Sequence, residues 1–500
     1  MDNVFTYILQ AAMNPTAIIM VLAGTFMGLV FGSLPGLSAT MAVALLIPMT
    51  FTLEPVPAIG AMIGGYIGGM AGGAVASILL NIPGTPSAVV TTFDGHPMVK
   101  AGRGAEALGW AAFASGCGSL VSWAILVLAA PKLAAMCTSF SAPEYTALAF
   151  FGLTIISTVS GKSMTKGLIA GMIGVVLSMA GTDPIWGDLR FTFGNYNLLS
   201  GVSTMPALIG LYSIPQILKS CLEKNTKGNV SVKIKNFVPT PKKLWAHRIN
   251  LLRTSLIGTI IGIIPATGGN IAAFIAYDQA KRFSKSPENF GKGEVDGIIA
   301  SEAANNAVCG GALIPLLTLG IPGDSPTAVL LGGLMIHGIT PGPMMFTEKY
   351  NVVVGIFTMV LIATIFMVLL QMVGIKLFTK VLAVPTNYLA AALVVLSLVG
   401  SYALRSNMFD VMMTIGLGIF GYFLMKAGFP IAPAVLGLVL GRMFEREFRT
   451  ALRTSYGDLS IFITRPVSCV ILLFAVAVLV WTIIKNYRDK KKNMGMDQVI

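Results

Sequence analysis

Two matched helix breaks lie inside membrane-length apolar segments of this chain. Residues 28–36 (GLVFGSLPG) match residues 258–266 (GTIIGIIPA) without a gap. Proline removes a backbone donor and clashes with the preceding turn, and glycine adds conformational freedom, so each site predicts an interrupted helix. In lipid, an interrupted helix is tolerated only where it lines a cavity or is covered by protein.

A second pair of breaks follows the first pair along the chain. The glycines at 72–73 precede Ile-Pro-Gly at 82–84, and the small residues at 311–312 precede Ile-Pro-Gly at 321–323. Matched interruptions in two halves of a membrane chain are the best sequence indication of a transporter's binding site. We therefore expect four helix ends to face one site.

The composition is typical of a membrane protein. Of the 500 residues, 55% are hydrophobic and 11% are charged, and the mean hydropathy is +0.80, whereas a soluble chain carries about 25% charged residues. Several apolar runs exceed the roughly 20 residues that cross a bilayer. The sequence predicts an all-α polytopic membrane protein with about 10–12 transmembrane helices, together with broken helices or re-entrant hairpins.

A basic stretch divides the chain into two halves of similar content. Residues 221–249 carry seven Lys or Arg against one acidic residue, Glu223, which predicts a cytoplasmic loop. Residues 1–220 then form the first membrane repeat, and residues 250–500 form the second repeat with the C-terminal spans. A nucleotide-binding role for this loop lacks the glycine-rich phosphate loop that such a role requires.

The charges near the breaks predict that the two repeats are inverted. The segment after the first break ends at the acidic Glu54, whereas the equivalent segment after the second ends near the basic Lys285. Conversely, Lys100 and Arg103 follow the first Ile-Pro-Gly, and a long neutral run follows the second. Positive charge marks the cytoplasmic side, so equivalent points are expected to face opposite sides.

The four breaks supply groups that suit an anion and a small cation. A half-helix N-terminus offers N–H donors and about half a positive charge, which suits a carboxylate. Freed backbone carbonyls suit Na⁺, and we expect no other metal. The predicted substrate- and ion-binding residues are Pro35, Gly36, Leu37, Ser38, Asn81, Pro83, Gly84, Thr85, Pro86, Thr267, Gly268, Gly269, Asn305, Asn306, Pro322, Gly323, Asp324 and Ser325.

Several of these residues also have a purely structural interpretation. A Gly-Pro kink can simply bend a helix, and Ser or Thr in a membrane helix often bonds its own backbone. Glu302 shares a helix face with Asn305 and Asn306, and a carboxylate within a membrane domain is a functional hypothesis by default. Its alternative is an interfacial position beside Lys292. Asp324 is either a cation ligand or a turn cap.

Other polar motifs carry no recognisable chemistry. The sequence Asp-Gly-His-Pro at 94–97 predicts a turn at a membrane edge. His96 and His337 lack a third ligand at metal spacing, and Ser163 lacks the partners of a nucleophile. None of the five cysteines forms a CxxC motif, which favours buried, inert thiols. The chain is therefore not predicted to be an enzyme.

Three long stretches together resemble one family. Residues 28–50, 72–98 and 291–343 look like the large membrane subunit of tripartite tricarboxylate transporters, the TctA family. The family's signatures fall on residues 35–38, 81–86, 302–306 and 320–323. One departure is Pro265-Ala266-Thr267-Gly268-Gly269, where the family more usually has Pro-Gly.

The resemblance implies secondary active uptake of a tricarboxylate or dicarboxylate across the bacterial inner membrane. It also implies coupling to a Na⁺ or H⁺ gradient, a small membrane subunit, and a periplasmic substrate-binding protein. No cofactor is expected besides the co-transported ion, and the other partners are the carboxylate and the lipid bilayer, not nucleic acid. The chain has no Walker motif, consistent with gradient-driven transport. The alternative function is an ion channel or passive anion pore.

Overall fold

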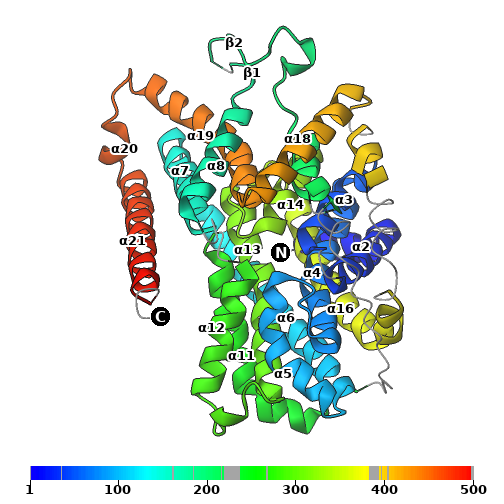
Figure 1. Ribbon diagram of the computed structural model, residues 1–500. Helices are drawn as coiled ribbons and strands as arrows, with labels where there is room; N and C mark the ends of the chain where they lie inside the picture. Colours follow the sequence, from blue (N-terminus) through cyan, green and yellow to red (C-terminus); the bar gives the residue numbers. More distant parts are fainter. Residues whose placement is uncertain are drawn as a thin grey trace. The chain divides into compact units, whose positions relative to one another are not determined.

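The computed structural model describes residues 2–34, 37–159, 163–183, 185–215, 217–218, 237–265, 268–381, 394–395, 397–402 and 405–496. These residues are mostly helical (Figure 1). The chain divides into two compact units. The first unit comprises Met1–Met136 and Leu208–Tyr422, and the second comprises Cys137–Ala207 and Phe423–Ile500.

The first unit contains both pairs of predicted breaks. Its elements are α1 (Asp2–Met13), α2 (Pro15–Ser33), α3 (Ala39–Thr50), α4 (Pro55–Leu80), η1 (Pro86–Ala88), α5 (Val89–Lys100), α6 (Gly104–Cys137), η3 (Ile209–Ser213), α11 (Pro241–Ile263), α12 (Gly268–Arg282), η4 (Pro287–Asn289), α13 (Val295–Leu319), α14 (Ser325–Ile336), α15 (Met345–Glu348), α16 (Tyr350–Val381) and most of α18 (Met408–Lys426).

All four predicted breaks separate helices. The first pair lies between α2 and α3 and between α11 and α12. The second pair lies between α4 and η1 and between α13 and α14. Both α4 and α13 end in a left-handed residue, Asn81 with φ 58° and Gly320 with φ 70°, which is a common way to terminate a helix. The predicted interruption of the helices is confirmed.

Glycines join the helix before each first break to the helix before the second break of the same half. A Cβ on Gly28 of α2 would collide with the backbone of α4, 2.7 Å from the Gly69 nitrogen. A Cβ on Gly258 of α11 would collide with α13 in the same way, 2.7 Å from the Ala304 Cα. Small residues let membrane helices approach this closely. The pairs α2–α4 and α11–α13 are therefore backbone-to-backbone seams, which we call the glycine seams.

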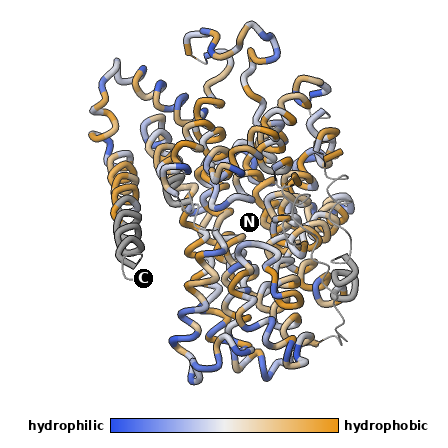
Figure 2. Tube along the Cα trace, in the orientation of Figure 1, coloured by the Kyte–Doolittle hydropathy of each residue, from blue (hydrophilic) through white to orange (hydrophobic). Residues whose placement is uncertain are grey.

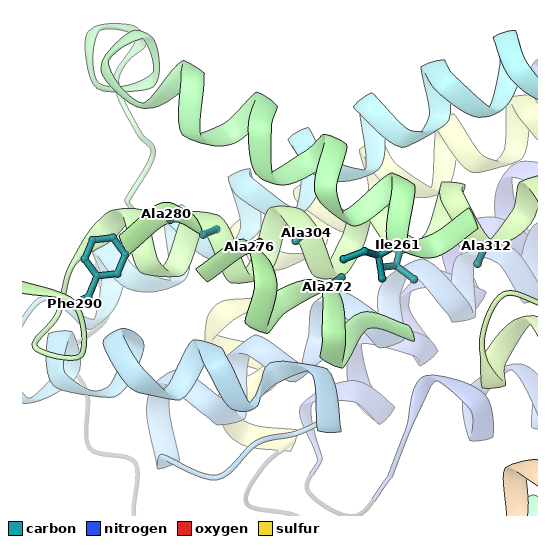
Figure 3. Packing of buried hydrophobic residues seen from close by; sticks show 9 residues of the cluster. Ile261, Ala272, Ala276, Ala280, Phe290, Ala304 and Ala312 are labelled. Atoms are coloured by element: carbon teal, nitrogen blue, oxygen red, sulfur yellow. The ribbon is translucent and has the colours of Figure 1, made fainter. Parts of the chain in front are cut away.

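An alanine stripe packs α12 onto this second seam. Ala272, Ala276 and Ala280 recur at helical spacing and are fully or almost fully buried. They lie in one cluster with Ile261 and Ala304, as Figure 3 shows. The small side chains keep α11, α12 and α13 close together, so the start of α12 is held beside the middle of α13.

The two halves exchange contacts within this unit. The segment η1–α5 of the first half packs on α12 and α13 of the second, and α14 of the second half packs on α3 and α4 of the first. Where α4 meets α13, Met70 contacts Asn305 and Tyr66 contacts Cys309. Because the pairing runs in opposite sequence directions, these two equivalent helices lie antiparallel at their contact.

Five helices in the described part of the chain are long and apolar enough to cross a membrane. They are α2, α4, α6, α16 and α18. The helices that follow the breaks are shorter, and α3 and α14 have 12 residues each. Figure 2 shows hydrophilic residues at the end of the α11–α12 hairpin that lies away from the break. The protein is thus an all-α polytopic membrane protein, and the inversion of its repeats stays a prediction.

The second unit is also mainly helical. It contains α7 (Ala142–Val159), α8 (Met164–Ser178), the two-residue antiparallel strands β1 (Gly181–Thr182) and β2 (Leu189–Arg190), η2 (Tyr196–Leu198), α9 (Thr204–Leu208), α19 (Ile431–Thr454), α20 (Ile461–Thr464) and α21 (Pro466–Met496). Helix α19 packs on α7 and α8, and α21 packs on α7. Arg449 bonds Asp183 and holds the pKa of that carboxyl below its ordinary value.

Candidate functional site

The turn before α5 and the start of α12 meet at one place in the first unit. There the hydroxyls of Thr85 and Ser87 lie 3.1 Å apart, and both residues are buried. A Cβ on Gly269 would lie 2.8 Å from the Met70 Cε and 3.0 Å from the Ser87 Cβ, and it would collide with the Asn305 side-chain oxygen. Glycine at 269 is what allows the two breaks to approach each other here. We call this group of five residues the anion cluster.

Asn305 is the most informative member of the anion cluster. Its side chain is fully buried, and its Nδ2 donates to the Met70 carbonyl over 3.0 Å. Its Oδ1 has no hydrogen-bond partner among the described residues. A buried acceptor without a donor costs about 1–3 kcal/mol. Such a group in a native protein requires an explanation, and a ligand or ordered water at the site is one.

The second Ile-Pro-Gly turn carries a carboxylate instead of a hydroxyl. Asp324 caps α14, because its side chain accepts from the Thr327 N–H over 3.0 Å and the Asp324 N–H donates to the Thr327 hydroxyl over 2.9 Å. The capping interpretation of Asp324 is confirmed. Its other oxygen accepts from the Tyr66 hydroxyl over 2.5 Å, and the Cys309 thiol interacts with that hydroxyl.

Glu302 lies one turn before Asn306 on α13 and is fully buried. Its carboxylate accepts from the Thr91 hydroxyl over 2.5 Å and from the Ser115 hydroxyl over 3.2 Å. The alternative in which Glu302 pairs with Lys292 is therefore wrong. The close contact of α5 and α6 with α13, including Gly118 against the Ala303 carbonyl, removes this position from the surface.

Asn306 extends the same polar group. Its Nδ2 donates to the Ser115 hydroxyl over 2.8 Å and to the Glu302 backbone carbonyl over 3.1 Å. Its Oδ1, like that of Asn305, is buried and has no partner among the described residues. The adjacent asparagines thus belong to two different groups: Asn305 to the anion cluster, and Asn306 to a group with Glu302, Ser115 and Thr91.

The predicted turn at residues 94–97 is wrong, because these residues lie inside α5. Asp94 is buried and accepts from the backbone N–H groups of Gly291, Gly293 and Glu294 over 2.8–2.9 Å, and from the Tyr277 hydroxyl over 2.8 Å. A carboxylate with this many donors no longer needs to bond its own backbone as it would in a turn. Asp94 instead joins the first half to the loop before α13.

The remaining predicted residues take structural positions in and around the breaks. Leu37 is buried in an apolar cluster with Met41 and Leu45, whereas Ser38 caps α3 by accepting from the Met41 nitrogen over 3.3 Å. Asn81 is exposed, and its contribution is the left-handed end of α4. The structure does not bring Asn81 together with the anion cluster.

The other predicted residues belong to the turns. Gly84 and Gly323 abut the carbonyls of Gly32 and Gly262 in equivalent fashion. Gly268 has φ +65°, which favours glycine. Pro83 is half-buried, Pro86 is exposed at the start of η1, Pro322 is buried, and Ser325 is half-buried at the start of α14. Pro35, Gly36 and Thr267 lie outside the described residues.

Sequence reasoning missed three contributors to these groups. The Met70 carbonyl and Tyr66 come from the glycine-rich run of α4, and Ser115 comes from α6. A lone tyrosine between glycine pairs is the one signal that the sequence offered for Tyr66. Nothing local distinguishes Ser115, because its partner Glu302 is 187 residues away.

Comparison with protein families gives one match that spans most of the chain. Residues 18–436 match the tripartite tricarboxylate transporter TctA family. That range includes both pairs of breaks, the anion cluster and Glu302. No solved structure matches the chain.

Two relatives from Agrobacterium vitis are similar to the chain. One, an uncharacterized 52.8 kDa protein in the TAR-I ttuC' 3'region, is 34% identical over 490 residues, covering 98% of this chain and 97% of the relative. The other, an uncharacterized protein in the TAR-II ttuC' 3'region, is 36% identical over 240 residues, covering 48% of this chain and 99% of that relative. Neither name states an activity.

Proposed function

The chain belongs to the tripartite tricarboxylate transporter TctA family, and from this premise we propose that it carries out secondary active uptake of a carboxylate across the bacterial inner membrane. The observation that supports this most is the anion cluster, where helix breaks from different halves meet, with Gly269 of one half against Ser87 of the other. Matched broken helices of this kind form the substrate sites of secondary transporters.

The anion cluster has the chemistry to bind a carboxylate. Freed N–H groups at the start of α12 and at the turn before α5 carry partial positive charge. The hydroxyls of Thr85 and Ser87 bond each other, so one of the two keeps its hydrogen as a neutral donor for a ligand, and no described Lys or Arg belongs to the cluster. A site without fixed positive charge releases its anion more easily, because binding relies on dipoles and on a co-bound cation.

Coupling follows from the need to neutralise this anion. A carboxylate in a low-dielectric site without a counter-charge costs several kcal/mol. In our proposal, Na⁺ or H⁺ binds together with the substrate, and only the empty and the doubly loaded forms change the side on which the site opens. The antiparallel contact of α4 and α13 is where one half would move against the other.

The same proposal assigns the partners. A small membrane subunit accompanies the chain, and a periplasmic binding protein delivers the carboxylate. Residues 221–249, of which 241–249 form the start of α11, then lie on the cytoplasmic side, in keeping with their positive charge.

Counterflow in proteoliposomes tests the proposal. Vesicles carry the chain with its small subunit, and external binding protein presents labelled citrate or succinate. We expect unlabelled internal substrate to stimulate uptake of the label. A channel or passive pore, the alternative function, would equilibrate the label without stimulation, and that result would overturn the proposal.

Asn305→Ala tests the anion cluster within this assay. We expect counterflow to fall at least roughly tenfold, because the variant removes the hydrogen bond from Asn305 Nδ2 to the Met70 carbonyl that joins α13 to α4 beside the site. Asn351→Ala is the matched control, since Asn351 is exposed at the start of α16. Equal counterflow in Asn305→Ala and wild type would remove Asn305 from the site.

A further inference from the structure

Helix α11 exposes an apolar face that ends among basic residues. The side chains of this face recur every three or four residues and are all exposed: Trp245, Ile249, Leu252, Leu256 and Ile260. That spacing puts them on one side of the helix. We call them the α11 stripe. An exposed apolar surface of this length in a membrane protein is covered by lipid or by another protein.

An arginine flanks the α11 stripe on each side, and each arginine stacks on an exposed aromatic ring. The Arg248 guanidinium carbon lies 4.2 Å from the centre of the Trp245 ring, and that of Arg253 lies 4.9 Å from the centre of the Phe283 ring at the end of α12. Both rings belong to side chains that are 69% exposed. The helical period puts residues 248 and 253 on opposite flanks of the stripe. Stacking holds both guanidinium groups beside the apolar surface.

Neither arginine has an acidic partner among the described residues. Acidic residues on α6, α12 and α13 pair instead with other cations, as in Arg103–Glu106, Arg282–Asp278 and His247–Asp296. Arg248 donates to the Trp245 carbonyl over 2.7 Å, and Arg253 donates to Asn250 Oδ1 over 3.0 Å. A guanidinium group carries further N–H donors, so each arginine keeps donors and a positive charge that no described residue uses.

The surrounding contacts also fix the direction of the Arg253 side chain. Asn250 Nδ2 donates to the Asp296 carboxylate over 2.8 Å and to the Asp296 carbonyl over 3.1 Å. This orientation of the amide leaves Asn250 Oδ1 to accept from Arg253. The guanidinium group is therefore held between Asn250 and the Phe283 ring. A cation that is already oriented loses less conformational freedom when it binds a ligand.

An unpaired arginine beside an exposed apolar stripe matches the chemistry of an anionic phospholipid. The planar guanidinium group suits phosphate, and basic pockets between membrane helices bind anionic headgroups. A soluble phosphate would make no use of the stripe, and an apolar protein partner would leave both arginines without a counter-charge. We propose that Arg248 and Arg253 each bind the phosphate of an anionic phospholipid, whose acyl chains lie along the α11 stripe. This binding does not depend on carboxylate transport.

The basic end of the hairpin is the expected place for such a lipid. Figure 2 shows the hydrophilic residues there, at the end of α11 and α12 away from the break. Positive charge of this kind marks the cytoplasmic side of a membrane protein. The cytoplasmic leaflet is also the one whose anionic lipids attract basic segments.

Competition binding to the purified full-length protein in non-ionic detergent tests the proposal. Radiolabelled phosphatidylglycerol is the probe, and the competitors are unlabelled phosphatidylglycerol, phosphatidylcholine and inorganic phosphate. We expect phosphatidylcholine to compete at least roughly tenfold more weakly than phosphatidylglycerol, because it carries no net negative charge. Millimolar inorganic phosphate should displace no label.

Three results of this competition would overturn the proposal. Equal competition by phosphatidylcholine would show only general lipid contact. Displacement by inorganic phosphate would show an ion site without a lipid. An absence of saturable binding would leave the α11 stripe to another occupant, such as a membrane protein partner.

A matched pair of arginine variants separates the site from general surface charge. Arg253→Gln is expected to weaken binding of phosphatidylglycerol at least roughly tenfold, because it removes both the charge and the phosphate donors. Arg282→Gln removes the same charge from the end of α12, where Arg282 already pairs with Asp278. Its loss is expected to stay below about fivefold, the effect of one basic residue near an anionic surface. Equal losses in the two variants would overturn the site.

The ring under Arg253 provides a second pair of variants, which is independent of charge. Phe283→Leu removes the stacked ring but keeps an apolar side chain, and it is expected to weaken binding. Phe283→Tyr keeps the ring and is expected to bind as the wild type does. Melting curves equal to that of the wild type would show that the variants are folded. Unchanged binding in Phe283→Leu would contradict the role of the stacked arginine.

Discussion

At the scale of single residues, His247 is the clearest titratable contact outside the apolar spans. It lies in the basic stretch 221–249, its Nδ1 is 2.9 Å from the Asp296 carboxylate, and its ring packs edge-on against Trp110 with centroids 5.1 Å apart. The hydrogen bond to Asp296 raises the pKa of His247, and partial burial opposes that rise. The pair links the start of α11 to the start of α13.

This pair predicts a pH-dependent contribution to stability. Because the folded pKa of His247 is raised, its contribution is fully present below the unfolded value of about 6.5 and is lost as the pH rises through the folded value. The melting temperature of His247→Gln should thus fall further below that of wild type at pH about 5.5 than at pH about 9. An equal difference at both pH values would show that the charge of His247 contributes nothing.

Residue identity alone grouped Asn305, Thr85 and Gly269 with the breaks, because Pro-Gly interruptions are local signals. The structure brings them together, and their role in binding stays a prediction. The contacts of Glu302 and Asp94 depend on Thr91, Ser115 and the backbone at 291–294, which are distant in sequence. A turn signal such as Asp-Gly-His-Pro states only a local preference, and the donors around Asp94 outweighed it.

At the scale of helices, the two glycine seams bring helix backbones of the first unit into direct contact. In each seam the glycines of the earlier helix lie against backbone atoms of the later one, as Gly24 does against Ala61 and Gly262 against Val308. Because the contacts are between backbone atoms, no side chain can change its rotamer to make room for a larger residue. The seams therefore hold each first break beside each second break.

Substitution within the seams should show this dependence. Gly28→Ala and Gly258→Ala place a methyl group against backbone atoms, so each is expected to destabilise the protein by about 1–3 kcal/mol or to reduce the folded yield. Gly416→Ala is the control, because a Cβ at this exposed position of α18 meets no atom within 4 Å. Thermal unfolding of the full chain in detergent measures the difference, and three equal melting curves would contradict the seams.

The helix breaks were predictable from the sequence, but the packing of the elements between halves was not. Periodicity shows that α12 has a small-residue face, yet it does not show that this face meets α13. Helix length was equally hard to judge. The run from Gly104 to Cys137 is one 34-residue helix, and Pro131 inside it did not end it.

At the scale of the whole molecule, the antiparallel contact of α4 and α13 agrees with the predicted inversion. The inversion predicts that Glu54, exposed before α4, and Lys285, exposed after α12, face opposite sides of the membrane. Single cysteines at 54 and 285, in a chain without its native cysteines, should react with an impermeant reagent from opposite sides. Labelling of both from one side would exclude inversion.

The exchange of contacts between the halves also bears on how the protein is made. Segment η1–α5 of the first half packs on α12 and α13, and Asp94 reaches its donors only in the loop at 291–294. When the ribosome has completed the first half, this segment still lacks the surfaces that bury it. Until the second half is synthesised, the Asp94 carboxylate and the segment η1–α5 remain in the insertion machinery or in lipid without their partners. A chain that ends at the central loop is therefore expected to fold poorly and to be degraded by membrane proteases.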